Sequence, residues 1–176
     1  DPLDNPGKYN LIFVPNAADD TVRLFGRKKG EGRTFRYIKR SGLPKVSPML
    51  DQWKLFVVKA WGNMDEKKGY LGGSYSEIIV AEPKDCCSEM YIEFGPYANE
   101  VEALNARKYF YTRFFRAVFY NKKISQNTAR DTYSDVPLQN FTANSDIDWS
   151  QSIPEIDQQL YRKYGLDQTE IDFIET

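Results

Sequence analysis

The 176-residue sequence predicts an α+β fold with a mixed or antiparallel sheet, one long helix and short helices near the C-terminal end. Short segments that alternate apolar and polar residues fill the first hundred positions, and apolar residues at helical spacing follow them. Such a separation of strands from helices is typical of α+β proteins. It argues against a doubly wound nucleotide-binding fold, as does the lack of a Gly-x-Gly-x-x-Gly sequence after any predicted strand.

The first predicted element is a β-hairpin. Residues 21–27 and 33–40 each have the pattern of a strand, and the sequence Lys-Lys-Gly-Glu-Gly at 28–32 predicts the turn between them. This hairpin concentrates basic side chains at or near its tip, namely Arg27, Lys28, Lys29, Arg33 and Arg36. Two interpretations stay open: an edge that lysines protect from pairing with other sheets, or an element that enters a DNA groove.

Three further strands are expected at 53–60, 75–81 and 88–94, with a turn at 82–87. Residues 61–73 are expected to form a long loop with four glycines, and this loop, with Lys67 and Lys68, is a second candidate for groove entry.

A helix is expected to begin after Asn99, a suitable N-cap, and to run to about residue 121. Its predicted buried spine consists of Val101, Leu104, Tyr111, Phe115 and Val118. The other face and the residues after it are basic, because residues 107–130 hold seven Lys or Arg and no Asp or Glu. The candidate DNA contacts here are Arg113, Arg116, Lys122, Lys123, Gln126, Asn127 and Arg130. Alternatively, Arg113 and Arg116 pair with the acidic tail, and Gln126 and Asn127 belong to a helix cap or turn.

Residues 142–176 are expected to form a tail of short helices packed on a single domain spanning residues 1–176. A helix is predicted over 154–164 with Gly165 ending it, and a last one from 169, capped by Asp167 or Thr169.

Composition limits the chemistry. The chain has no histidine, which excludes Ser-His and Cys-His catalysis by this chain alone, and its two cysteines, Cys86 and Cys87, cannot complete a tetrahedral zinc site. The net charge of −1 hides a strong asymmetry, since residues 23–59 sum to +9 and residues 107–130 to +7. Two interpretations of these basic blocks stay open: solvated faces of ordinary elements, or one surface that follows phosphates.

A metal-dependent nuclease is the catalytic alternative. Such enzymes bind Mg²⁺ through two or three carboxylates with a lysine nearby, and Glu77 with Glu82-Pro83-Lys84 has part of that pattern. Pro83 argues against it, because proline would break the strand that must align the ligands. A non-catalytic protein-interaction domain is a further alternative.

Several segments in fixed order resemble the C-terminal part of bacterial N6-adenine DNA methyltransferases of restriction–modification systems. They are Tyr-Thr-Arg-Phe-Phe-Arg at 111–116, Ser-Gln-Asn-Thr-Ala-Arg at 125–130, Val-Pro-Leu-Gln-Asn-Phe at 136–141, and the segments 160–166 and 170–175. The likeness is strongest from residue 109 onward and looser over residues 33–108.

The resemblance implies a sequence-specific, double-stranded-DNA target-recognition domain in the cytoplasm, cut from a longer chain. The family's Asn- or Asp-Pro-Pro-aromatic motif and its S-adenosylmethionine loop do not occur here. We therefore expect no catalytic, cofactor or metal site in this chain, and S-adenosylmethionine in a separate catalytic methyltransferase domain that serves as its partner. The parent enzyme would be an adenine-specific methyltransferase, with or without an endonuclease domain.

Overall fold

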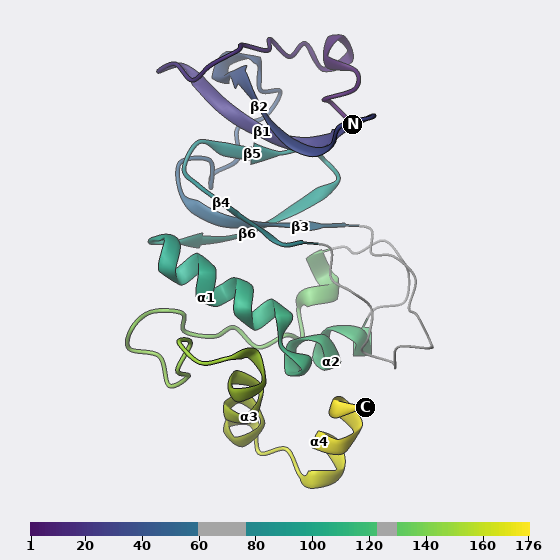
Figure 1. Ribbon diagram of the computed structural model, residues 1–176, viewed down its shortest axis with the longest axis vertical. Helices are drawn as coiled ribbons and strands as arrows, with labels where there is room; N and C mark the ends of the chain where they lie inside the picture. The colour runs from purple at the N-terminus through teal and green to yellow at the C-terminus, as the bar shows by residue number, and fades with distance from the viewer. Residues whose placement is uncertain (60–76, 123–129) are drawn as a thin grey trace. The chain divides into compact units, whose positions relative to one another are not determined.

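The computed structural model describes residues 1–59, 77–122 and 130–176 (Figure 1). The chain divides into two compact units. The N-terminal unit comprises residues 1–58 and 79–100, and the C-terminal unit comprises residues 59–78 and 101–176. Strands lie in the first and helices mainly in the second, which confirms the predicted α+β class.

The N-terminal unit contains two three-stranded sheets. In the first, β1 (Thr21–Lys28) lies between β2 (Gly32–Lys39) and β5 (Asp85–Cys87), antiparallel to β2 and parallel to β5. In the second, β3 (Trp53–Val58) lies between β4 (Ile79–Ala81) and β6 (Tyr91–Tyr97), antiparallel to both. Two 3₁₀ turns, η1 (Pro6–Tyr9) and η2 (Arg40–Gly42), flank the hairpin in sequence. The predicted β-hairpin is thus confirmed as β1–β2.

Strand β1 is buried on both faces. Val22 and Leu24 face a core with Leu3, Ile38, Leu50 and Cys86. On the opposite face, the ring of Phe25 packs against Phe35, Tyr91 and Phe56, with centroid distances of 4.7, 5.0 and 6.2 Å. The aromatic cluster packs the part of the hairpin next to its basic tip, because Phe25 and Phe35 pair two positions from Arg27 and Arg33.

Strand β5 falls in the segment predicted as a turn, so that prediction was wrong. Asp85, fully buried, accepts hydrogen bonds from Arg23 Nε at 2.6 Å and Arg23 Nη2 at 2.8 Å, and from the Glu82 amide at 2.9 Å. The paired charges make burial of this carboxylate tolerable and hold β5 beside β1. Asp85 therefore has a structural task in the protein interior.

Lys54 is the other fully buried charged side chain of this unit. Its ammonium donates to the backbone carbonyls of Gln52, Glu82 and Leu50, at 2.9, 3.0 and 3.2 Å. Burial lowers the pKa of Lys54, while nearby Asp85 partly offsets that effect. This lysine ties β3 to the β4–β5 turn and is unavailable to a ligand.

The predicted long helix is two helices, α1 (Glu100–Tyr111) and α2 (Arg113–Lys122), separated at Thr112. Thr112 Oγ1 accepts a hydrogen bond from the Phe115 amide at 3.1 Å, which makes Thr112 the N-cap of α2. The buried carboxylate of Asp157 accepts the Arg113 and Phe114 amides at 3.0 and 2.9 Å. These bonds stabilise the N-terminus of a second helix at a place where the sequence predicts one continuous helix.

The break also changes which side chains are buried. Phe115 is buried as predicted, but Val101 is 64% exposed and the prediction for it was wrong; Leu104, Tyr111 and Val118 are half-buried. The fully buried positions of the two helices are instead Ala103, Ala106, Tyr109, Phe110, Phe114, Phe115 and Phe119. Phe119 packs against Tyr133 of η4 (Arg130–Tyr133), with ring centroids 4.7 Å apart. Such aromatic contacts, and not helical spacing alone, decide which side chains of the two helices are buried.

The C-terminal residues form α3 (Ile153–Tyr164) and α4 (Gln168–Glu175). Gly165 ends α3 with φ of 67°, and Asp167 caps α4, both as predicted. Arg113 donates to the Ile174 and Glu175 carbonyls at 3.3 and 2.6 Å, which satisfies carbonyls at the end of α4. These contacts pack α4 against α2. None of the helices in the described ranges has the length and apolar character that crossing a membrane requires.

Asp157 gives unfolding a pH dependence. Burial raises its pKa to about 6 from an ordinary 3.8, while the two amides oppose the rise. The folded chain therefore holds a proton between about pH 4 and 6 that the unfolded chain has lost, so this group's contribution to stability falls as pH rises through that window. Between pH 4 and 7, the free energy of unfolding of the wild type should fall by about 2 kcal/mol more than that of Asp157→Asn. Urea unfolding at each pH measures both values. Parallel curves for the two proteins would contradict this.

Candidate nucleic-acid interface

The tip of the β1–β2 hairpin is tightly specified by its backbone. Residues 29–31 connect the strands, Lys28 pairs with Gly32, and Arg27 pairs with Arg33. Gly30 and Gly32 have φ of 84° and 83°, which side-chain-bearing residues rarely adopt. The turn therefore needs its glycines and leaves the basic side chains to project from either side.

Arg27 and Arg33 lie directly opposite each other across the two strands. Both are exposed, and neither forms an ion pair with any residue that the structure describes; the same is true of Lys29. Like charges directly opposite one another repel, which is unfavourable for the isolated hairpin. A bound anion would relieve that repulsion, so this pair is the described feature best suited to a phosphate.

Tyr91 of β6 lies close to the same two arginines. Burial raises the pKa of its phenol, and the charges of Arg33 and Arg27 offset part of the rise. The rings of Tyr91 and Phe35, which both pack against Phe25, thus lie near the arginine pair. Tyr91 was not among the predicted contacts, because β6 is more than fifty residues from the hairpin in the chain.

The N-terminal segment anchors the hairpin backbone. Asp1 Oδ2 accepts the Arg27 amide at 3.1 Å and the Ser88 hydroxyl at 2.8 Å, and Asp4 Oδ1 accepts the Lys29 amide at 2.7 Å. The two bonds to the hairpin use backbone donors, so they leave the side chains of Arg27 and Lys29 without an ion pair to any described residue. They hold the tip in place before any ligand arrives.

The other two of the five predicted contacts on the hairpin share one carboxylate. The Glu31 carboxylate forms ion pairs with both Lys28 and Arg36. Hydrogen bonding to Lys28 is the main cause of the lowered pKa of Glu31. Among the residues that the structure describes, Arg27, Lys29 and Arg33 have no ion-pair partner, and the other two predicted contacts pair with Glu31, which the sequence analysis did not single out.

The remaining predicted contacts are scattered. Arg113 pairs with Glu175 at 3.3 Å, the alternative that the sequence left open, and Arg116 is half-buried in α2. Arg130 is exposed at the start of η4, and Lys122 is the last residue of α2. The other candidates lie outside the described residues: Lys67, Lys68, Lys123, Gln126 and Asn127. The described cluster of unpaired basic side chains is thus the hairpin tip of the N-terminal unit.

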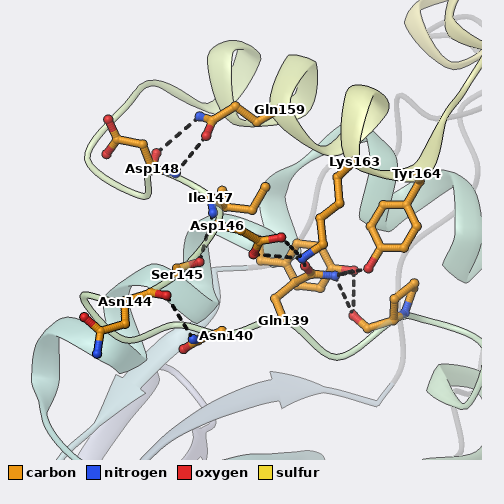
Figure 2. Close-up of polar contacts among 12 residues, drawn as sticks. Gln139, Asn140, Asn144, Ser145, Asp146, Ile147, Asp148, Gln159, Lys163 and Tyr164 are labelled. Carbon is orange, nitrogen blue, oxygen red and sulfur yellow. Dashed lines mark hydrogen bonds and ion pairs between the residues drawn. The ribbon is translucent and has the colours of Figure 1, made fainter.

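A dense polar network in the C-terminal unit is structural. Gln139 Nε2 donates to Tyr164 Oη at 2.7 Å and the Pro137 carbonyl at 3.1 Å, and its Oε1 accepts Lys163 Nζ at 2.9 Å (Figure 2). Lys163 also donates to Asp146 at 2.9 Å. Gln139 is the buried member of the network, and its polar atoms are satisfied by bonds to Lys163 and Tyr164, which tie the segment before α3 to that helix.

Four of the segments that carry the family resemblance meet in this unit. Arg113 binds the end of α4, Phe114 stacks on Tyr164 with centroids 4.8 Å apart, and Gln139 bonds Lys163 and Tyr164. These segments thus belong to the C-terminal unit, whereas the basic tip of the hairpin belongs to the N-terminal unit.

The nuclease pattern does not assemble a metal site in the described ranges. Glu82 pairs with Arg23 at 3.2 Å, and Lys84 occupies a turn with φ of 70°. No group of three His, Cys, Asp or Glu side chains among the described residues could hold a metal ion. Cys86 is buried and free, and burial raises the pKa of its thiol to about 12, which keeps it protonated.

No protein-family model matches this sequence, and neither a curated protein nor a solved structure is significantly similar to it. The family resemblance carried by residues 109–176 therefore stays a prediction from the sequence.

Proposed function

We propose that this chain binds duplex DNA through the β1–β2 hairpin and acts as the target-recognition domain of an adenine-N6 DNA methyltransferase. The observation that carries the proposal is the opposed, exposed and unpaired Arg27–Arg33 pair with Lys29 beside it. Three unpaired cations at the end of one narrow element suit a polyanion with closely spaced charges. DNA is such a polymer, with one charge per ~1.7 Å of duplex axis.

A hairpin is also a suitable shape for reading sequence. The major groove of B-DNA, about 12 Å wide, admits a two-stranded β-ribbon, and arginine recognises guanine through its O6 and N7 atoms. Phosphate contacts would set the register of the hairpin, and one of the tip arginines would read base edges. The Phe25, Phe35 and Tyr91 cluster supports the ribbon close to its tip.

The methyltransferase assignment comes from the family resemblance. The resemblance implies a second partner, namely a catalytic domain of the same protein that binds S-adenosylmethionine. It also implies that the protein acts on bacterial DNA in the cytoplasm. In this division of labour the hairpin selects the site, and the catalytic domain takes the flipped adenine.

Two measurements test the proposal at its two levels. Binding of the chain to a fluorescent 20-base-pair duplex should weaken about 40-fold between 50 and 200 mM salt if three cations neutralise phosphates. Selection from a pool of random duplexes should then enrich one short sequence. Absence of binding at 50 mM salt would overturn DNA binding, whereas binding without enrichment would overturn target recognition alone.

A further inference from the structure

The carboxylate of Glu31 occupies a position that suits an anion. One of its oxygens pairs with Lys28 Nζ at the end of β1, and the other pairs with Arg36 Nη2 on β2. An ammonium and a guanidinium converging on two oxygens is the arrangement with which proteins hold phosphate. The side chain of Glu31 belongs to the turn that joins the two strands.

We propose that Lys28 and Arg36 form a second phosphate-binding position, which Glu31 fills in the free chain and which a DNA phosphate takes over on binding. This rests on the proposed function and adds a built-in competitor to the same hairpin. Glu31 lowers the affinity for DNA, and a phosphate must displace it.

Glu31 is placed to be displaced. Its side chain is 43% exposed, as is that of Arg36, and Lys28 is 39% exposed, so water already competes for both ion pairs. Exposed pairs of this kind contribute little to stability. Glycine flanks Glu31 on both sides, so the backbone around it has the freedom to turn the carboxylate away.

The position of this second pair agrees with a ribbon inside a groove. Alternate residues of a strand face opposite sides, so Arg36 projects from the face opposite to that of Arg33. Arg27 and Arg33 thus supply charge on one side of the hairpin, while Lys28 and Arg36 supply it on the other. A ribbon in the major groove has a phosphate backbone on each side, and both faces would then meet phosphates.

The test is duplex binding by Glu31→Gln at 100 mM salt, with Glu89→Gln as the matched control. Glu89 is an exposed carboxylate of the same unit, outside the hairpin, so its removal measures the general effect of one negative charge. We expect Glu31→Gln to bind about five times more tightly than wild type, and Glu89→Gln less than twice as tightly. In a Lys28→Gln/Arg36→Gln background, Glu31→Gln should give no gain.

The outcomes separate the two proposals. If wild type binds DNA but Glu31→Gln gains no more than Glu89→Gln, or keeps its gain without Lys28 and Arg36, the second phosphate position is wrong and hairpin binding stands. If wild type does not bind DNA, the proposed function fails and this inference fails with it. Unfolding midpoints of all variants, measured by circular dichroism, show whether each remains folded.

Discussion

Replacing both Arg27 and Arg33 with glutamine is expected to weaken duplex-DNA binding about 100-fold at ~100 mM salt, because the variant loses two arginine contacts to phosphate or guanine. The slope of log affinity against log salt should fall by up to about 1.8 if both contacts are to phosphate. Fluorescence anisotropy across a salt series measures both quantities.

The matched control is Lys45→Gln/Lys84→Gln, which removes the same charge from exposed positions of the same unit outside the hairpin. It should weaken binding only a few fold. The arginine variant should unfold at the same denaturant concentration as wild type or slightly higher, since the opposed like charges are gone. Equal binding losses in the two variants would contradict a specific role for the tip.

Replacing Asp157 with alanine is expected to lower the free energy of unfolding by about 2 kcal/mol at pH 7. The carboxylate caps the N-terminus of α2 by accepting two amides, and that of Phe114 lies in the buried core. Loss of an N-cap costs about 0.5–2 kcal/mol, and an unsatisfied buried donor adds to that cost. Guanidinium unfolding followed by circular dichroism measures the change.

Asp157→Asn tests the reason for that loss. The asparagine oxygen can still accept one of the two amides and carries no buried charge, so Asp157→Asn should be clearly more stable than Asp157→Ala at pH 7. The exposed acid Asp172 of α4 provides a control, since Asp172→Ala removes a carboxylate that bonds only an exposed glutamine. A loss for Asp157→Ala no larger than for Asp172→Ala would show that α2 does not depend on this cap.

Local sequence predicted the elements whose signals are local. The hairpin followed from alternation on either side of a glycine-containing turn, and the ends of α3 and α4 followed from Gly165 and Asp167. The break at Thr112 could not be predicted in this way, because the carboxylate that stabilises it is 44 residues from Arg113 in the chain. Strand β5 likewise depends on the pairing of Asp85 with Arg23, 62 residues away.

The same limit applies to the candidate site. The sequence located the basic hairpin, but charge alone does not tell which cations are free. Glu31 pairs with both Lys28 and Arg36, and Glu175 pairs with Arg113, whereas Arg27 and Arg33 lie opposite each other and form no ion pair with any residue that the structure describes. Those differences arise from strand register and from packing of the C-terminal helices, which residue composition does not encode.

The most direct test of the hairpin as the DNA-contacting surface is an NMR titration of the ¹⁵N-labelled chain with a short duplex. The largest shifts are predicted for the amides of residues 27–36 and for the side-chain Nε–Hε signals of Arg27 and Arg33. Shifts concentrated elsewhere in the chain, with the hairpin signals unmoved at saturating DNA, would contradict the proposed interface.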